Sequence, residues 1–292
     1  MLARPLQPSD PDAAALHQGA AYVELDRYRV VLVSGADART WLHDLVTTDV
    51  ASLRDLQARP SLLLTPTGRV RAFFHVIGME ANEVLLAQAP GQPHPVDALL
   101  APYVLSSDVD LTPTALRLVA VPGREEPPGW ARAARPSVLG GGFDLLADEP
   151  SLEAVRDGLA AEGLAPAPAR AAEARRVALG RPAFPRDLDL DSLPAEAGWD
   201  VPPVTDRGKG CFLGQESVAK VANLGHPARV VLAVEADDPL EPGPVFDTSG
   251  REVGALTSAD GPVGLARVRW EARAGPFATA GGRALRRRPG GG

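Results

Sequence analysis

The pattern of the chain changes near Arg229, and this change limits the folds that the sequence can adopt. Beyond Arg229, short apolar runs alternate with the turn signals Glu241-Pro242-Gly243, Thr248-Ser249-Gly250 and Asp260-Gly261-Pro262. Short strands with closely spaced turns are typical of a small all-β domain. Before Arg229, strand-like and helix-like runs are mixed, without a short repeat or a heptad pattern. The sequence therefore predicts an α+β protein that ends in a small β-domain.

The mixed region contains several elements that the hydrophobic periodicity indicates. Two apolar runs, 61–64 and 70–77, flank Thr65-Pro66-Thr67-Gly68, which predicts a hairpin turn. A long segment, 180–208, is rich in prolines and acids and has little periodicity, so we expect a structured loop of the kind that is often functional. The remaining expected elements are strands within 22–33, at 84–87, 116–121 and 138–146 (the last interrupted by three glycines), and helices near 41–46, 96–104, 151–162 and 169–179.

Composition narrows the class of protein. The 292 residues, 45% of them hydrophobic, are enough for two or three domains with real cores. No apolar run approaches the roughly 18 residues that a membrane span needs, and the first residues lack the apolar region of a signal peptide. A single cysteine cannot form an internal disulfide, so we expect a reducing, cytoplasmic location.

Charge gives no general indication of nucleic-acid binding, because the formal net charge is −7. The run Arg286-Arg287-Arg288 is a local exception and is followed by Pro289 and three glycines. We expect residues 286–292 to form a disordered basic tail, with an RNA-binding arm as the alternative.

The only cysteine and the only two lysines lie within twelve residues: Lys209, Cys211 and Lys220. High alanine, arginine, proline and glycine indicate a GC-rich genome, which explains the scarcity of lysine but not the position of the two that are present. A loop that needs a compact ammonium rather than a planar guanidinium would explain the position. A thiol two residues from a positive charge is also favoured in its thiolate form.

The same segment predicts a helix that begins just after Gly214, because Gln215 to Asn223 are mostly good helix formers. The free N–H groups of its first turn would favour an anion, whether a thiolate, a carboxylate or a phosphate. Two interpretations of Cys211 and Lys209 remain open at this point. The pair is reactive, or Cys211 is a small buried apolar residue and Lys209 an ordinary surface charge.

Other kinds of site find little support. We expect no metal site, because one cysteine cannot hold an iron–sulfur cluster and the five histidines have no metal-ligand spacing. These histidines are His17, His43, His75, His94 and His226. No glycine-rich phosphate loop occurs either. The acidic run 187–191 fits a solvated strand edge or turn. Alternatively, one of its carboxylates accepts paired N–H bonds from a flat heterocycle.

The run Lys209-Gly210-Cys211-Phe212-Leu213-Gly214-Gln215-Glu216 resembles the signature K-G-C-[FY]-x-G-Q-E of the YgfZ family. These are folate-binding proteins related to the aminomethyltransferase (T-protein) of the glycine cleavage system. Weaker likenesses occur in the family's order over residues 20–285. They are Gly35-Ala36-Asp37, Trp41-Leu42, Thr48-Asp49-Val50, Thr67-Gly68-Arg69-Val70, Gly225-His226 with Arg229, and the stretch from Gly254 to Ala266.

The resemblance implies a fold and its division into domains. It implies a GcvT/YgfZ-like α+β protein in which two α+β subdomains surround a central folate pocket and a small β-barrel follows. We expect the two interleaved subdomains in residues 1–225, the barrel in 226–285 and the basic tail in 286–292.

The resemblance also implies site residues. The T-protein has a pterin-binding Glu in a G-x-E element ahead of a P-x-E-A-G stretch, which here corresponds to Asp187 ahead of Pro194-Ala195-Glu196-Ala197-Gly198. Its catalytic Asp, after the hairpin glycines, falls on Ala72, and no acid occurs between Arg59 and Met79. Loss of a proton-handling carboxylate costs roughly a hundredfold in rate, so aminomethyl transfer is disfavoured.

The function that the resemblance implies is that of a folate-binding accessory protein rather than a conventional enzyme. Such proteins are implicated in assembly or repair of iron–sulfur clusters, including those of enzymes that thiomethylate tRNA. The expected cofactor is tetrahydrofolate or a derivative, and the expected partners are client iron–sulfur proteins, with no membrane, no strong nucleic-acid signal and a monomeric state. The expected reactive residues are Cys211 and Lys209; the expected folate-binding residues are Asp187, Lys209, Gly210, Gln215, Glu216 and Arg229.

Two other functions remain as alternatives. One is a tetrahydrofolate-dependent aminomethyltransferase or another one-carbon transferase. The other is a binding module without cofactor that adapts proteins or tRNA through its arginine tail.

Overall fold

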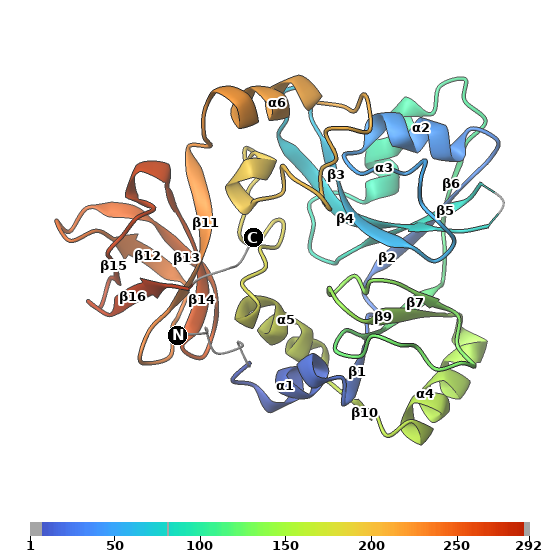
Figure 1. Cartoon of the computed structure of the whole chain (residues 1–292), viewed down its shortest axis with the longest axis horizontal. Coiled ribbons are helices and arrows are strands. Elements are labelled where there is room, and N and C mark those ends of the chain that lie inside the picture. Colours follow the sequence, from blue (N-terminus) through green and yellow to red (C-terminus); the bar gives the residue numbers. More distant parts are fainter. Residues whose placement is uncertain (1–7, 81, 289–292) are drawn as a thin grey trace.

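Two five-stranded sheets and a closed barrel form the molecule (Figure 1). The computed structural model describes residues 8–80 and 82–288. The barrel is at the left of the view, and helix α5 (Ala169–Ala178) lies between the barrel and the second sheet. The expected α+β fold with a C-terminal barrel is confirmed.

The first sheet is antiparallel, in the order β3-β4-β5-β2-β6. One face packs against helices α2 and α3, whose apolar residues Trp41, Leu42 and Leu100 enter a core with Val33, Phe74 and Leu86 of the strands. The elements are β2 (Arg29–Ser34), α2 (Ala38–Leu45), β3 (Ala58–Leu64), β4 (Val70–Gly78), β5 (Val84–Gln88), α3 (Val96–Leu100), the 3-10 turn η1 (Ala101–Tyr103) and β6 (Asp110–Pro113).

The second sheet has the order β10-β1-β7-β9-β8. Helix α4 covers one face through Leu152 and Leu159, and α1 with α5 covers the other. The second of these cores also contains Ile77 and Leu85 of the first sheet, so the two sheets share apolar contacts. The elements are α1 (Pro11–Gln18), β1 (Ala21–Glu24), β7 (Arg117–Val121), β8 (Ala133–Ala134), β9 (Phe143–Ala147), η2 (Glu149–Ser151), α4 (Leu152–Ala161) and β10 (Ala165–Pro166).

The sequence analysis expected a strand at 138–146 that three glycines interrupt. In the structure these glycines, at 140–142, lie outside the strand. They precede β9, which begins at Phe143, and all three have positive φ, between 54° and 79°. Residues with positive φ cannot continue an extended strand, and glycine adopts this conformation readily. The glycines therefore form a turn at the edge of the second sheet.

The barrel closes in the order β11-β14-β13-β12-β15-β16 around a core that includes Val234, Val245 and Val268. Its strands are β11 (Arg229–Glu235), β12 (Gly243–Phe246), β13 (Glu252–Asp260), β14 (Val263–Arg269), β15 (Phe277–Thr279) and β16 (Ala284–Arg287), with a 3-10 turn, η4 (Trp270–Ala272).

The sequence analysis expected a disordered basic tail at residues 286–292, and the structure of residues 286–288 contradicts this expectation. Arg286 and Arg287 belong to β16, and Arg286 forms an ion pair with Asp237 at 2.7 Å. Arg288 is buried and donates to the carbonyl of Ala178 at the end of α5. Residues 286–288 are therefore part of the barrel and its contact with α5. Residues 289–292 lie outside the described part of the chain.

The long loop after α5 joins all three parts. It contains one 3-10 turn, η3 (Pro194–Ala197), and leads into helix α6 (Gln215–Leu224). Phe184, Leu188, Trp199 and Phe212 of this segment are buried in a core with Leu62 and Leu64 of β3 and with Val231 and Leu265 of the barrel. Apolar burial of this kind is what orders a loop that lacks regular secondary structure.

Candidate functional site

The K-G-C loop, residues 208–214, is held against the C-terminal end of α2. The backbone N–H of Leu213 donates to the carbonyl of Leu45, and the N–H of Asp206 donates to that of Thr47. Helix α6 begins at Gln215, where the sequence predicts it. Gly214 has φ +82°, and a Cβ there would lie 2.5 Å from the carbonyl oxygen of Thr65. Glycine is therefore needed for the β3–β4 turn to pack against the start of α6.

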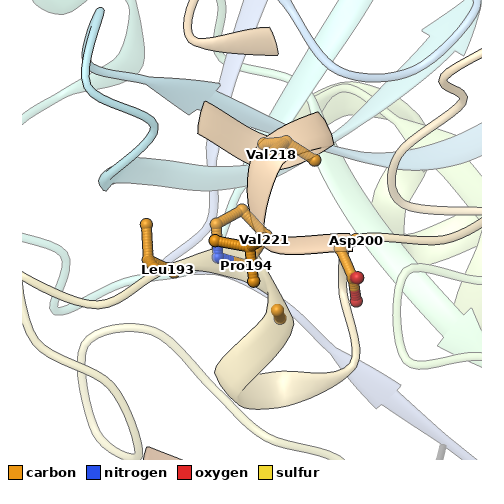
Figure 2. A pocket seen from close by; sticks show the side chains of 6 residues that line it. Leu193, Pro194, Asp200, Val218 and Val221 are labelled. Carbon is orange, nitrogen blue, oxygen red and sulfur yellow. The ribbon is translucent and has the colours of Figure 1, made fainter. Parts of the chain in front are cut away.

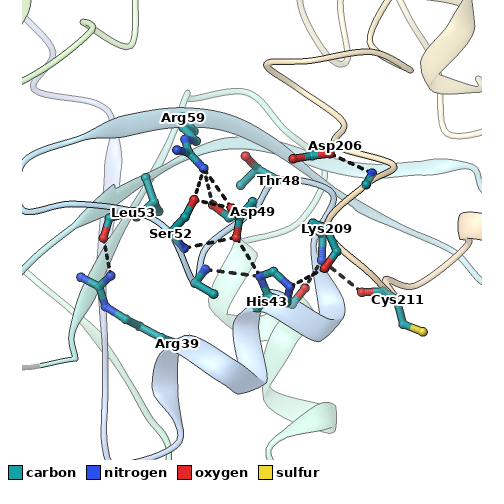
Figure 3. Close-up of polar contacts among 12 residues, drawn as sticks. Arg39, His43, Thr48, Asp49, Ser52, Leu53, Arg59, Asp206, Lys209 and Cys211 are labelled. Carbon is teal, nitrogen blue, oxygen red and sulfur yellow. Dashed lines mark hydrogen bonds and ion pairs between the residues drawn. The ribbon is translucent and has the colours of Figure 1, made fainter.

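Lys209 fastens this loop to α2 (Figure 3). Its ammonium donates to the backbone carbonyls of His43 and, at 3.1 Å, Cys211. In return, His43 Nε2 lies 3.0 Å from the carbonyl of Lys209, to which it can only donate. Burial lowers the pKa of Lys209, and the charges of Asp44, Asp49 and Asp206 partly offset this effect. The interpretation of Lys209 as an ordinary surface charge is therefore wrong.

His43 connects the loop to a polar cluster that the sequence analysis did not identify. Nδ1 of His43 accepts from the N–H of Ala51 at 3.3 Å and lies 3.2 Å from Asp49 Oδ1. Asp49 also accepts from Ser52, and the guanidinium of Arg59 lies 3.6 Å away. Burial opposes ionisation, but the bonds from Ser52 and the charge of Arg59 hold the pKa of Asp49 below its ordinary value, and a protonated His43 would add to this effect. The sequence feature that could have indicated this cluster was the run Thr48-Asp49-Val50, which resembles the family's pattern.

Cys211 is exposed, so the interpretation as a small buried apolar residue is wrong. Figure 3 shows its sulfur directed away from Lys209 and from the polar cluster. Lys209 binds the carbonyl of Cys211 and not its thiol, and Gly210, with φ +110°, provides the turn between them. The loop thus presents the thiol to solvent while its backbone is fixed.

Two further predicted residues lie on α6 and one on the barrel. Gln215 and Glu216 form the first turn of α6, where an acidic side chain is favoured by the helix dipole. Arg229 begins β11 opposite Arg269 of β14, with an exposed side chain. The structure therefore brings Lys209, Gly210, Cys211, Gln215 and Glu216 together on one continuous segment.

Asp187 lies outside the segment from Lys209 to Glu216, and its hydrogen bonds contradict the expectation that it binds a pterin. Its Oδ1 accepts from the hydroxyls of Thr257 at 2.5 Å and Ser258 at 2.7 Å. Its Oδ2 accepts from Arg176 at 2.7 Å and from the N–H of Ala183 at 2.8 Å. The side chain has no exposed surface. A carboxylate has about four lone-pair positions, so Asp187 has none left for a ligand.

A β-bulge in the barrel makes this arrangement possible. The register between β13 and β14 shifts between Leu256 and Ser258, leaving Thr257 as the extra residue. Neighbouring residues of a regular strand point to opposite faces, whereas a bulge redirects a side chain, so both hydroxyls reach Asp187. Asp187 therefore joins the long loop and Arg176 of α5 to the barrel.

A second carboxylate cluster joins the same loop to the barrel. Arg267 of β14 donates to Glu196 at 2.7 Å and to Asp189 at 2.6 Å. The hydrogen bond from Arg267 lowers the pKa of Asp189 to about 2. Glu196 is also buried. These ion pairs give the acidic run 187–191 a structural function that the sequence analysis did not consider.

Figure 2 shows a shallow apolar hollow between η3 and α6. Its volume is about 170 Å³, including space open to solvent. Ligand pockets for drug-sized molecules are roughly 300–1,000 Å³, so this hollow is too small for a folate. It is lined by Leu193, Pro194, Ala195, Asp200, Val218 and Val221.

A group of rings lies on the face of the first sheet opposite α2. The rings of Phe73 and Trp199 have centroids 4.6 Å apart and are tilted by 31°, and His75 meets Phe73 edge-on at 5.5 Å. Burial, with a smaller contribution from the charge of Arg181, lowers the pKa of His75 to about 3. We call Phe73, His75 and Trp199 the aromatic cluster. Phe73 and His75 retain partial exposure, and flat rings of this kind can stack on a planar heterocycle.

Ala72 does not face this cluster. It is fully buried in the core beneath α2 and α3, and its neighbours Phe73 and His75 along β4 point to the other face. The position to which the alignment assigns the catalytic acid of the T-protein therefore lies in the core and not at the aromatic cluster. The absence of any acid between Arg59 and Met79 is unaffected, since it is a property of the sequence.

None of the described helices has the length and apolar character that crossing a bilayer requires. The described side chains include no group of three or more His, Cys, Asp or Glu residues that could hold a metal ion.

Known proteins resemble the chain in three ways. Residues 229–290 match the family model of the CAF17 C-terminal beta-barrel domain. A protein of Arabidopsis thaliana named "Putative transferase At1g60990, chloroplastic" is 28% identical over 277 residues. This match covers 85% of the chain but only 63% of the relative, so the chain spans less than two thirds of that protein's length.

The third likeness concerns the fold. The crystal structure of the glycine cleavage system aminomethyltransferase T from Bartonella henselae superimposes with a TM-score of 0.77, covering 94% of this chain and 87% of that one. At 19% sequence identity this match shows a shared fold and nothing finer. Taken together, the barrel model, the relative and this fold support the resemblance of the chain to GcvT-like proteins of the YgfZ/CAF17 family.

Proposed function

We propose that this protein binds tetrahydrofolate or a derivative and acts as an accessory factor in the assembly or repair of iron–sulfur clusters in client proteins. Through those clients it supports the thiomethylation of tRNA. In this proposal the exposed thiol of Cys211 is the group that contacts the client's cluster, its sulfur or the one-carbon unit of the folate.

The observation that carries the proposal is the contrast between the backbone and the thiol of the K-G-C loop. Lys209 and His43 fix the loop backbone through each other's carbonyls, while the Cys211 side chain is exposed and its thiol is free. A thiol that served only packing would be buried. A fixed loop with a free thiol instead suits a group that reacts with, or binds to, something outside the chain.

The aromatic cluster supports the folate part of the proposal. Phe73, whose ring contacts the buried Trp199, offers partly exposed ring surface for a pterin, and His75 stays neutral at physiological pH because its pKa is about 3. A neutral imidazole both donates and accepts a hydrogen bond, as the edge of a pterin does. Asp187 is reassigned in this proposal from a ligand contact to a residue that positions the loop and the barrel.

Aminomethyl or other one-carbon transfer remains the alternative, since the fold is that of an aminomethyltransferase. Transfer needs a group that handles a proton near the folate nitrogen. The neighbours of Ala72 along β4 are Arg71 and Phe73, neither of which is a proton acceptor near pH 7. His75, further along the strand, has a pKa of about 3, which is too low for a general base near pH 7. Turnover of a methylamine donor with tetrahydrofolate would favour the alternative.

The site of action within the cell is also part of the proposal. We infer a reducing compartment from the single cysteine, with the cytoplasm as the expected one. The Arabidopsis relative is described as chloroplastic, which is a statement about that protein.

The direct test is complementation. Cells that lack the protein are given the wild type, Cys211→Ser or the control variant Ser217→Ala on α6. The activity of an iron–sulfur enzyme that thiomethylates tRNA is measured together with the level of each variant. The proposal expects the wild type and Ser217→Ala to restore activity and Cys211→Ser to fail at equal abundance. Full activity with Cys211→Ser would refute the role of the thiol.

A further inference from the structure

The thiol of Cys211 lies between two points at which the K-G-C loop is fixed. After it, the ring of Phe212 is buried in the core that contains residues of β3 and of the barrel. Before it, the carbonyl of Lys209 accepts a hydrogen bond from Nε2 of His43 at 3.0 Å (Figure 3). The direction in which the exposed thiol points is therefore set by one attachment on each side, within two residues.

The end of helix α2 explains why the loop attaches here. The last carbonyls of a helix have no donor within the helix itself. The ammonium of Lys209 donates to the carbonyl of His43, and the N–H of Leu213 donates to that of Leu45, the last residue of α2. A cation at this end also interacts favourably with the helix dipole. The K-G-C loop thus completes α2, and the imidazole of His43, in the last turn of the helix, is placed beside the loop.

The bond from His43 to Lys209 does not depend on the protonation state of the imidazole. In the neutral ring, Nδ1 accepts from the N–H of Ala51 at 3.3 Å, so the proton lies on Nε2, which donates to Lys209. In the charged ring, Nδ1 also carries a proton and faces Asp49 Oδ1 at 3.2 Å, while Nε2 still donates. The side chain of His43 is only 16% exposed, so water competes little for these bonds.

In the part of the chain that the structure describes, no other contact holds the backbone of Lys209 as closely. Its N–H lies 3.5 Å from the carbonyl of Asp206, which is long for a hydrogen bond. Its ammonium is attached through a flexible four-carbon chain, so it can keep its contacts while the backbone moves. Gly210 follows with φ +110°, and glycine restricts the backbone least. The imidazole of His43 is therefore the rigid attachment on this side of the thiol.

We propose that His43 is a positioning residue for the Cys211 thiol. Its Nε2–H group fixes the carbonyl of Lys209 and thereby the direction in which the thiol meets its reaction partner. This inference rests on the proposed function, in which that thiol is the contacting group. A displacement of about 1 Å at a reacting group can cost about 100-fold in rate. Loss of the Nε2 donor should therefore lower the activity that the protein supports by about 10- to 100-fold while the chain stays folded.

Two substitutions separate the two bonds of the imidazole. In His43→Gln the amide nitrogen reaches about as far as Nε2, so it can donate to the carbonyl of Lys209. In His43→Asn the shorter amide reaches only as far as Nδ1, so it can accept from the N–H of Ala51 but cannot reach Lys209. A residue that served only to order the segment after α2 would be replaced by Asn and not by Gln. A residue that positions the thiol would show the opposite order.

The test measures how firmly the thiol is held and what the protein then does. A nitroxide spin label is attached to Cys211, the only cysteine of the chain, and its electron paramagnetic resonance spectrum reports the motion of the label in each purified variant. Activity is measured with unlabelled protein in the complementation assay for the thiomethylating enzyme, together with the level of each variant. Urea unfolding shows whether the fold is retained. The matched control is His94→Asn, because His94 is exposed.

The expected result is a wild-type spectrum and full activity for His43→Gln and His94→Asn. For His43→Asn we expect narrower lines, which indicate a more mobile label, and activity lower by about 10- to 100-fold at equal abundance.

Wild-type activity of His43→Asn, or a folded His43→Gln that fails, would overturn this inference and leave the proposed function intact. Unfolding of both His43 variants would also overturn it, because His43 would then be a residue of the fold. Full activity with Cys211→Ser would overturn the role of the thiol in the proposed function, and this inference with it.

Discussion

His43 and Lys209 each bind the backbone carbonyl of the other, although 166 positions separate them in the sequence. The contact requires a proton on Nε2 of His43, and Nδ1 is then free to accept from the N–H of Ala51. Protonation of Nδ1 would remove that bond and create an ion pair with Asp49, 3.2 Å away. The K-G-C loop is thus coupled to α2 and to the segment after it.

Replacement of Lys209 by Met should loosen the loop. The ammonium donates to two carbonyls, and bonds from charged donors contribute about 1.5–3 kcal/mol each, less where the group is partly solvated. We expect a loss of about 1–3 kcal/mol in the free energy of unfolding, measured with urea. Lys220→Met is the matched control, since Lys220 is exposed and is the only other lysine. Equal stability of the two variants would contradict the role of Lys209 in holding the K-G-C loop against α2.

The thiol of Cys211 should react without unfolding of the chain. The residue is exposed, so Ellman's reagent should modify one thiol per molecule in native buffer at a rate that urea changes little. Because the side chain has no packing function, Cys211→Ser should change stability by less than about 0.5 kcal/mol and leave folate binding unaltered. A thiol that reacts only in denaturant would show that it is buried.

Asp187→Ala should destabilise the protein strongly and affect ligand binding only through the fold. The change leaves Arg176, Thr257 and Ser258 with unpaired groups, and breaking a buried pair costs about 3–5 kcal/mol. The control is Asp191→Ala on the same loop, which has an exposed side chain. If Asp187→Ala had wild-type stability but no longer bound tetrahydrofolate, Asp187 would be a ligand contact after all.

The stability of the protein should fall on acidification, in part because of His75. Its pKa is about 3 in the folded state, whereas the unfolded chain has the ordinary value near 6.5. Between these values the unfolded state binds more protons, so stability decreases as the pH falls from about 6.5 toward 3. We expect His75→Phe to show a shallower decrease between pH 7.5 and pH 5 in urea titrations. The exposed His94→Gln should follow the wild type; an identical slope in His75→Phe would contradict the lowered pKa of this imidazole.

Local signals were enough to predict much of the fold. The β3–β4 turn, the start of α6 after Gly214 and the β-strands after Arg229 follow from turn residues, helix formers and short apolar runs. Each of these features depends on residues that are close in the sequence. The exposed position of Cys211 was one of two interpretations, and only the packing of the loop on α2 decides between them.

The surroundings of Asp187 depended on contacts that no local pattern reveals. Its hydroxyl donors are 70 and 71 positions away and reach it only because a bulge redirects Thr257. The alignment matched the catalytic acid of the T-protein to Ala72 from sequence order alone, whereas the structure shows that Ala72 is buried in the core. The arginine tail was expected to be disordered from its composition, but Arg286 and Arg287 pair with barrel strands.

The measurement that tests the account most directly is equilibrium binding of tetrahydrofolate to the purified protein, followed by tryptophan fluorescence in the wild type and in Trp199→Phe. Trp199 contacts Phe73 in the aromatic cluster, so the account predicts saturable quenching with one folate per chain and loss of most of the quenching in the variant. Exposed Trp130→Phe serves as the control and should retain it. Absence of saturable binding by the wild type would contradict the folate function itself.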